Sequence, residues 1–320
     1  MWKYAFRRIV TLVPVLVGTS FIAFMVLYLS PGDVLTLMII GHTPPEVIEA
    51  FREYHGLNDP ILIQYIRYIT RAFTGNFGVS FTWRTPVSHA IIHHLPHTLQ
   101  LGFTSILISL ALALPIGILA AIKKSTWIDG FIKGIALIGI SVPVFVLAIL
   151  LMFLFPELSP RMPRPGASSQ TIFIASQQYH SYLLLPSITL GIGMLSAMLY
   201  TIRNSLHEVI EKNYIRTARS KGLQKNTIVC KHALRSAIIP ILSDFRSHLG
   251  NFVVAIIIVE HIFRRPGIGR LLMQGILSRD YPTTLGAIFM FVLIYAIINI
   301  LLDITQAFID PRIRERGLRV

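Results

Sequence analysis

Long runs without a charged residue restrict the fold of this 320-residue chain more than any other feature. Asp, Glu, Lys and Arg are absent from five runs of 21 or more residues: 9–29, 98–122, 134–155, 182–202 and 281–302. A helix of about 20 apolar residues crosses the roughly 30 Å hydrocarbon core of a bilayer. Only 14% of the chain is charged, whereas soluble domains carry about 25%. The sequence therefore predicts an all-α, polytopic protein whose surroundings are the lipid bilayer.

A sixth span is predicted at 237–263, although this stretch is less purely apolar. Asp244, Arg246 and His248 lie in its first half, and Glu260 and His261 lie near its end. Six spans place both termini and the basic interval before this stretch on one side of the membrane. With five spans, the interval and the C-terminal tail would lie on opposite sides.

The distribution of Lys and Arg predicts which side that is. The segments on the side of the termini carry 18 of these residues, and the short loops on the other side carry six. Positive loops stay in the cytoplasm, so both termini are expected to be cytoplasmic. The net charge of +14 then reflects topology. Nucleic-acid binding is not expected, because a nucleic-acid-binding domain has no use for several long uncharged runs.

The spans divide the chain into four parts. Residues 1–30 hold the N-terminus and an uncleaved first span, since its apolar run is longer than the 7–15 residues of a signal peptide. Residues 31–97 form an outer segment with amphipathic helices, one beginning at Pro44 and one covering 61–73. Residues 98–310 form a five-helix core that includes a cytoplasmic loop, 204–236. Residues 311–320 form the tail.

The polar, basic interval 213–240 is predicted to be a helix–turn–helix. Asn213 is expected to cap a short helix that ends with Gly222 at the C′ position. Asn226 is expected to cap a second helix over 227–237, and Pro240 to begin the fifth span. Ile215 and Ala218 would form a small apolar knob among basic side chains, suited to a groove on a partner. The alternative is a solvated basic loop that only sets topology.

This interval resembles the EAA loop of the membrane subunits of ABC importers, in the form found in oligopeptide, dipeptide and nickel permeases. The matching residues are Tyr214, Arg216, Thr217, Ala218, Arg219, Lys221, Gly222, Leu223, His232, Ala233, Leu234, Arg235, Ala237 and Pro240. The resemblance covers nearly the whole chain. It includes Pro31-Gly32-Asp33, Gly75 to Ser80, Pro266 to Arg270 and Arg279 to Pro282.

The resemblance implies a permease subunit of the bacterial inner membrane that forms half of a pore. Two cytoplasmic ATPase subunits, a periplasmic binding protein and a second, homologous permease are the implied partners, with a heterodimer favoured. The residues expected to couple to the ATPase are Tyr214, Arg216, Thr217, Ala218, Arg219, Lys221, Gly222, Leu223 and His232. The chain itself has no phosphate-binding loop of the Gly-x-x-x-x-Gly-Lys-Ser/Thr type. It is therefore not expected to be an enzyme or to bind a cofactor.

Ionisable residues inside a span are functional candidates. Asp244 and His248 are four residues apart and share a helix face, so they are possible pore-lining residues. Arg246 points the other way and is expected to reach toward the cytoplasmic surface. The more conventional interpretation is that all three lie in the first turns of the span, close to water.

Several alternatives remain open from the sequence. His89, His93, His94 and His97 could handle a metal, but Pro96 is expected to interrupt their helical spacing, and no metal site is predicted. The substrate could be an oligopeptide, a dipeptide, an antimicrobial peptide, glutathione, nickel or another small solute. An ion-driven secondary transporter is a further alternative, for which Asp303 is the nearest acidic candidate. No motif of a membrane-embedded enzyme is present.

Overall fold

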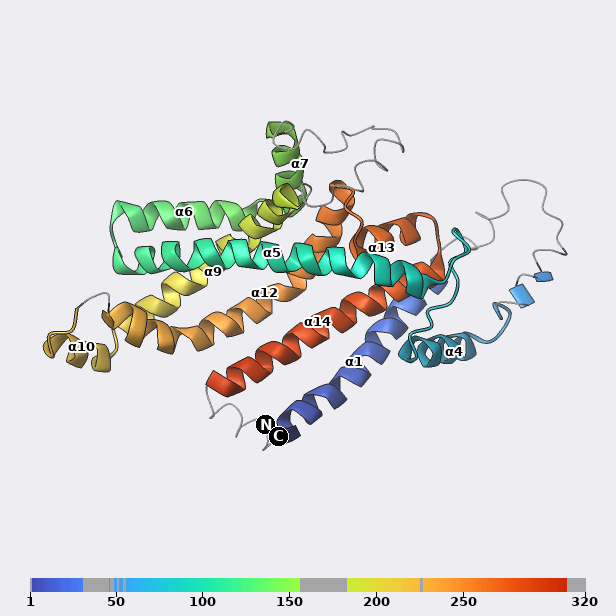
Figure 1. Ribbon diagram of the computed structural model, residues 1–320, viewed down its shortest axis with the longest axis horizontal. Coiled ribbons are helices and arrows are strands. Elements are labelled where there is room, and N and C mark those ends of the chain that lie inside the picture. The colour runs from blue at the N-terminus through green and yellow to red at the C-terminus, as the bar shows by residue number, and fades with distance from the viewer. Residues whose placement is uncertain are drawn as a thin grey trace. The chain divides into compact units, whose positions relative to one another are not determined.

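The computed structural model describes residues 2–30, 46, 49–50, 52–53, 56–155, 183–224 and 227–309. Within these ranges the chain is helical apart from turns, loops and one isolated bridge between Val79 and Pro86, which confirms the all-α class (Figure 1). The predicted helix beginning at Pro44, the cap at Asn226 and the tail 311–320 lie outside the described residues.

In the part of the chain that the structure describes, five helices are each long and apolar enough to cross a membrane. They are α1 (Trp2–Leu29), α5 (Val87–Ile122), α9 (Leu184–Ile210), α12 (Leu234–Ile262) and α14 (Tyr281–Ile309). Each contains one of the predicted apolar runs or most of it. Helix α5 also includes His89 to His97 and continues through Pro96, so the predicted interruption there is wrong. Proline is tolerated in membrane helices because neighbouring groups satisfy the carbonyl that it leaves without a donor.

The third predicted span, 134–155, is not one straight helix. Helix α6 (Trp127–Ser141) and helix α7 (Val144–Leu154) meet at an angle of 103°. Pro143 causes the break, because proline disfavours helical geometry at the residue before it and has no N–H to donate. Val142 is accordingly extended, with φ −82° and ψ 120°. If α6 and α7 together form one broken span, the described part of the chain has six spans.

The chain separates into two compact units. Unit 1 comprises Met1–Thr98 and Pro266–Ile300, and unit 2 comprises Leu99–Arg265 and Leu301–Val320. Unit 1 therefore contains α1, α4 (Ile61–Phe73), α13 (Ile268–Leu277) and the first residues of α5 and α14. Unit 2 contains α6, α7, α9, α12, the rest of α5, the end of α14 and two shorter helical segments, Asn213–Ser220 and Ile228–Ala233.

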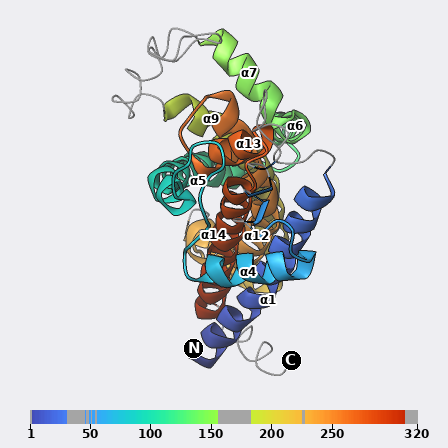
Figure 2. The ribbon, with the colours of Figure 1, turned by 90° about the vertical axis from the view of Figure 1, so that its right-hand side faces the viewer.

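Helix α4 in unit 1 has the bounds that its apolar spacing predicts, and it lies across α1 (Figure 2). Tyr65 is the main contact between the two helices. Its hydroxyl donates to the Val17 carbonyl at 2.7 Å, and its ring packs edge-on against Phe21 and Phe24. Tyr65 and Ile69 are buried, whereas Leu62 and Ile66, which flank them on the apolar side of the helix, are exposed.

A buried carboxylate also organises unit 1. Asp280 precedes α14 and caps it, accepting the backbone N–H of Thr283 at 3.4 Å. The same carboxylate accepts the Ser80 hydroxyl, the Phe81 N–H at 3.2 Å and the Thr283 hydroxyl at 2.9 Å. Because Asp280 is fully buried, these bonds replace the water that an ionised carboxylate requires. They fix the loop after α4 to the start of α14.

Helix α9 is the centre of unit 2 and packs against α12, α6 and α7. Small residues let neighbouring backbones approach closely, as is usual for helices in membranes. A Cβ at Gly139 would lie 2.0 Å from the hydroxyl oxygen of Ser196, and a Cβ at Gly117 would lie 2.7 Å from a methyl carbon of Ile202. The Ser109 hydroxyl donates to the Gly191 carbonyl at 2.8 Å.

Candidate coupling site

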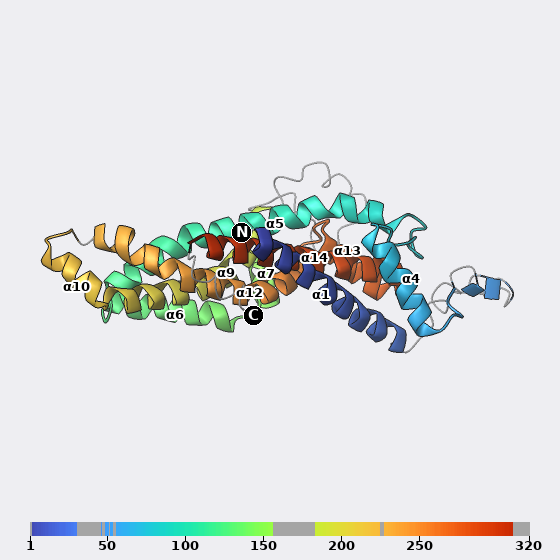
Figure 3. The same ribbon diagram turned by 90° about the horizontal axis from the view of Figure 1, so that it is seen from below.

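The short helix predicted in the basic interval is present as α10 (Asn213–Ser220), next to the end of α9 (Figures 1 and 3). The predicted cap is one residue too late. Lys212 has the extended conformation of an N-cap residue, with φ −68° and ψ 149°. Asn213 is already helical, and its carbonyl accepts the Thr217 hydroxyl at 3.2 Å. Asn213 therefore cannot adopt the extended backbone from which an asparagine caps a helix.

The end of α10 is as predicted. Gly222 has φ +77°, and its N–H donates to the Arg219 carbonyl at 2.9 Å. The Leu223 N–H donates to the Ala218 carbonyl at 3.4 Å. These two bonds make a Schellman motif, which requires a left-handed residue at C′ and so favours glycine. The chain therefore leaves α10 in one defined direction.

The side chains of α10 divide into an anchoring face and an exposed face. Ile215 is completely buried, so its predicted place in a projecting apolar knob is wrong. The helix buries Ile215 because so short a helix needs tertiary packing to be stable. Ala218 is half-buried. The exposed residues of the predicted set are Tyr214, Arg216, Thr217, Arg219, Lys221, Gly222 and Leu223. The exposed apolar surface therefore comes from Tyr214 and Leu223.

The second helix of the interval is not a separate element. A π-helical segment, η2 (Ile228–Ala233), starts where predicted and continues directly into α12. Pro240 lies inside α12, so both the predicted end at 237 and the predicted start of the fifth span at Pro240 are wrong. Helix α10 and η2 pack against each other, with Ile228 and Val229 buried and His232 half-buried. The packed pair therefore continues without a break into a membrane-spanning helix.

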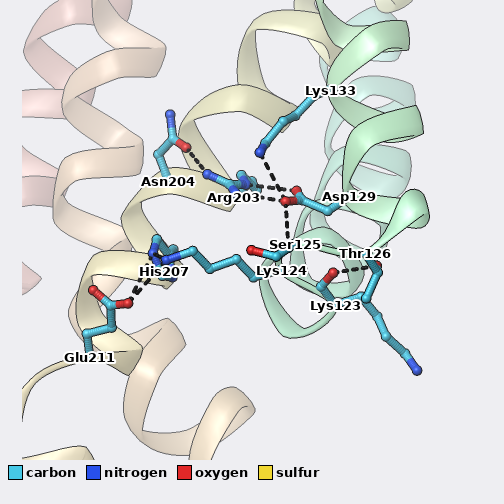
Figure 4. A network of polar contacts seen from close by, with 10 residues as sticks. All are labelled: Lys123, Lys124, Ser125, Thr126, Asp129, Lys133, Arg203, Asn204, His207 and Glu211. Carbon is cyan, nitrogen blue, oxygen red and sulfur yellow. Dashed lines mark hydrogen bonds and ion pairs between the residues drawn. The ribbon is translucent and has the colours of Figure 1, made fainter.

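A buried ion pair near this site was not predicted. Asp129, on the first turn of α6, accepts two bonds of 3.0 Å from the Arg203 guanidinium on α9 (Figure 4). Lys133 lies 3.0 Å from the same carboxylate, and the Ser125 N–H donates to it at 3.2 Å. The Asp129 side chain is only 2% exposed, and that of Arg203 is 12% exposed. The sequence did contain a signal for this ion pair: Asp129 is the only acidic residue between Asp59 and Glu157, so it stands out as a partner for a basic side chain.

A second set of charges joins the loop between α5 and α6 to Glu211, which lies between α9 and α10. Lys124 contacts His207 of α9 and lies 3.2 Å from the Glu211 carboxylate, which lies 3.3 Å from the His207 ring (Figure 4). The hydrogen bond from Lys124 is the largest cause that lowers the pKa of Glu211 below its usual range. Glu211 is thus firmly ionised at neutral pH. The start of α10 is therefore tied to the α5–α6 loop as well as to η2.

The candidate pore residues form two polar contacts in unit 2. The Asp244 carboxylate lies 3.3 Å from the His248 ring and accepts the Thr201 hydroxyl of α9, so the two predicted residues do share a face. Arg246 contacts a different helix, and its side chain is 37% exposed. It forms an ion pair with Asp303 of α14, and Gln306, one turn further on, lies 3.4 Å from the Ser243 hydroxyl. Polar side chains therefore connect α12 to both α9 and the end of α14.

Within the described residues, no group of three or more His, Cys, Asp or Glu has the geometry of a metal site. The rings of His89 and His93 pack edge-on at 5.0 Å, and the His94 ring bonds to the Ala90 carbonyl at 2.7 Å. Aromatic and backbone contacts therefore account for three of the four clustered histidines.

Comparison with known proteins identifies the class. Residues 113–315 match the family model of the binding-protein-dependent transport system inner membrane component, and residues 1–102 match the model of its N-terminal region. The chain therefore belongs to this family. It is a multi-pass inner-membrane permease subunit of an ABC importer of the peptide class, and separate subunits of such importers hydrolyse ATP.

Individual relatives agree with this assignment. The chain is 35% identical over 316 residues to the glutathione transport system permease protein GsiC of Salmonella paratyphi A, covering 99% of this chain and 100% of that protein. GsiC of Escherichia coli K12 gives the same identity and coverage. The inward-facing MetNI methionine ABC transporter has a similar fold, with a TM-score of 0.50 and 17% identity over 69% of this chain and 96% of that chain.

Proposed function

We propose that this chain forms one half of a translocation pore for short peptides, which a periplasmic binding protein delivers. The curated relatives support the substrate class, since glutathione is itself a modified tripeptide. We further propose that the partner permease is a different, homologous chain. Both termini and α10 would lie in the cytoplasm, in line with the distribution of Lys and Arg. The chain would hold no cofactor of its own.

One observation carries the coupling role: α10, with its exposed face, is joined by packing and by the chain itself to two membrane helices, α9 and α12. Ile215 anchors α10 inside unit 2, and α10 packs on η2, which continues into α12. Lys212 follows α9 directly, and the Glu211–Lys124 pair ties this junction to the loop between α5 and α6. A rigid displacement of α10 by closure of an ATPase dimer would therefore move α9 and α12 together.

A crosslinking experiment tests this role. Leu223→Cys and Ala218→Cys, each in a chain in which Cys230 is replaced by Ser, are paired with cysteines in the groove of the cognate ATPase subunit. We expect a disulfide in at least one nucleotide state. Trp83→Cys is a matched control, because Trp83 and Leu223 are both 41% exposed. Absence of crosslinks from both α10 positions in every nucleotide state would reject the docking surface.

The Asp244–His248 pair is proposed to line the inner mouth of the pore. Both side chains are partly exposed, and the Thr201 hydroxyl holds the carboxylate in place. Asp244→Asn and His248→Ala should lower peptide uptake without lowering assembly with the ATPase, as measured in proteoliposomes. Unchanged uptake of every peptide tested would remove this pair from the pore.

Nickel or another small solute is the competing substrate within the same class. The substrate is best identified from the binding protein encoded with this permease, by mass spectrometry of the ligand that it retains after purification. A short peptide supports the proposed substrate class, and a bound metal complex contradicts it. Uptake that is lost on depletion of ATP, with the proton gradient kept intact, distinguishes the ABC mechanism from a secondary transporter.

A further inference from the structure

Unit 1 contains a cavity of about 490 Å³ that has no part in the coupling site. It lies between the end of α1, helix α4, the loop 76–81 and the start of α14. We call it the Arg71 pocket. Its volume is within the range of about 300–1,000 Å³ that is typical of small-molecule sites.

The lining of the Arg71 pocket is amphipathic and positively charged. Phe24 and Leu27 of α1 and Leu285 of α14 supply apolar surface. Arg52, Arg67 and Arg71 supply three guanidinium groups, and the described residues that line the cavity include no acidic side chain. A ligand that satisfies this lining carries an anionic group that is joined to an apolar body.

Two of the polar side chains are held in position by other residues. The Asp59 carboxylate forms an ion pair of 2.7 Å with the Arg67 guanidinium, which lies next to Gly56. Gly56 has φ +64°, and a Cβ there would lie 2.0 Å from the Arg67 guanidinium, so glycine makes room for it. The Tyr68 hydroxyl donates to the Leu285 carbonyl at 3.1 Å. Burial is the main cause that raises the pKa of Tyr68, so the hydroxyl stays protonated. The Arg67 guanidinium is therefore positioned before a ligand binds.

The ends of two membrane-spanning helices border the Arg71 pocket. Helix α1 ends at Leu29, next to the lining residue Tyr28, and α14 begins at the lining residue Tyr281. Tyrosine is enriched at this level of a membrane, where lipid headgroups meet the hydrocarbon. The amphipathic helix α4 leaves Leu62 and Ile66 exposed beside its buried residues Tyr65 and Ile69, so part of its apolar side is free to face lipid, as in an interfacial helix. A bilayer that α1 and α14 both cross would therefore place the cavity at headgroup depth, whichever side of the membrane faces outward.

We propose that the Arg71 pocket is a binding site for an anionic phospholipid. The phosphate would bind the arginines, and the glycerol and first acyl carbons would pack against Phe24, Leu27 and Leu285. Guanidinium groups bind phosphate through paired, charge-assisted hydrogen bonds, and a bilayer supplies this ligand at high local concentration. The proposal is separate from the import function and does not depend on the identity of the transported solute.

Native mass spectrometry of the full-length permease in neutral detergent tests this site. The protein is mixed with phosphatidylglycerol, with phosphatidylcholine or with inorganic phosphate. We expect retained phosphatidylglycerol, little phosphatidylcholine and no stable phosphate adduct. Arg71→Gln combined with Arg67→Gln should reduce retention by at least about tenfold, because each charge-assisted bond to phosphate is strong.

Arg84→Gln is the matched control, because Arg84 is exposed in the same segment and does not line the cavity. It removes the same charge and should leave retention unchanged. Equal loss in Arg84→Gln, equal retention of the two lipids or unchanged retention in the double variant would overturn the proposal. So would displacement of the lipid by short peptides, since the pocket would then be a solute site. If the double variant fails to fold, the single variant Arg71→Gln, which keeps the Asp59–Arg67 ion pair, serves as the test in its place.

Discussion

Two buried carboxylates show how single residues set the architecture of each unit. Asp129 receives both arms of the Arg203 guanidinium together with Lys133, and Asp280 receives hydroxyl and backbone donors. A buried charge is tolerated only when its partners compensate for lost hydration. Each carboxylate can therefore be tested by removing its charge while keeping its shape.

Asp129→Asn should destabilise the protein by about 3–5 kcal/mol, because it leaves the Arg203 charge buried without its main partner. The measurement is unfolding of the purified permease in mixed micelles. Replacing both partners with apolar residues (Asp129→Leu with Arg203→Met) should recover much of the loss, since no charge then remains buried. If the double variant is no more stable than Asp129→Asn, packing and not charge explains the effect.

Asp280→Asn should free the loop 80–83 from the start of α14. The amide of asparagine has only one acceptor oxygen, and its NH2 group would face other hydrogen-bond donors. Several charge-assisted bonds of about 1.5–3 kcal/mol each are therefore lost or weakened. Hydrogen exchange should show faster exchange of the Phe81 and Thr283 amides. Asp59→Asn, at a half-exposed ion pair in the same unit, should cost at most about 1 kcal/mol. Unchanged exchange at Phe81 would show that the loop is held by other contacts.

At the scale of elements, the connection between α10 and α12 determines how a movement could be passed on. The Schellman motif at Gly222 sets the direction in which the chain leaves α10, and η2 carries it into α12 without a break. A π-helical segment often marks a functional site. The geometry of the turn at Gly222 is therefore expected to matter more for coupling than for assembly.

Gly222→Val should uncouple ATP hydrolysis from transport while the complex still assembles. Nothing lies within 4 Å of a Cβ at this position, so the effect comes from the left-handed backbone and not from a clash. A β-branched residue at such a backbone costs roughly 1–3 kcal/mol, which favours a different path for the chain. Transport and ATPase rates in proteoliposomes check this. Gly222→Asn is the control, since Asn tolerates this conformation; equal coupling in both variants would contradict the prediction.

At the scale of the molecule, membrane topology connects these sites to a function. We expect loop 79–86 and α10 to face opposite sides of the bilayer, because three spans separate them along the chain if α6 and α7 form one broken span. The proposed orientation places α10 in the cytoplasm. This arrangement would let an ATPase act on one face while a binding protein delivers solute to the other, as proposed for this chain.

Labelling with a membrane-impermeant thiol reagent tests this topology in intact spheroplasts. Trp83→Cys should react from outside, and Leu223→Cys should react only after the membrane is opened, both in a chain in which Cys230 is replaced. Their equal exposure in the structure makes the rates comparable. The opposite pattern would reverse the orientation, and labelling of both from outside would reject six spans.

The sequence by itself predicted where the long apolar helices lie and where α10 ends, although the run 134–155 is broken at Pro143. Uncharged runs of about 20 residues favour helices in a bilayer, where each backbone polar group needs a partner within the protein, and a left-handed C′ position favours glycine. It also indicated that Asp244 and His248 share a face, because four residues make about one turn. These features depend on the local chain and on its solvent, so composition and spacing are sufficient to predict them.

Only the tertiary structure decided which side chains meet. Ser80 and Asp280 are 200 residues apart, Asp129 and Arg203 are 74 apart, and Arg246 and Asp303 are 57 apart. Ile215 is likewise buried in a helix that packs against η2, which lies beyond a turn. Such pairings follow from how helices pack, and one sequence allows many packings with the same hydrophobic pattern. The physical reason is that a buried charge selects its partner through the free energy of the whole packed structure, which no short stretch of sequence contains.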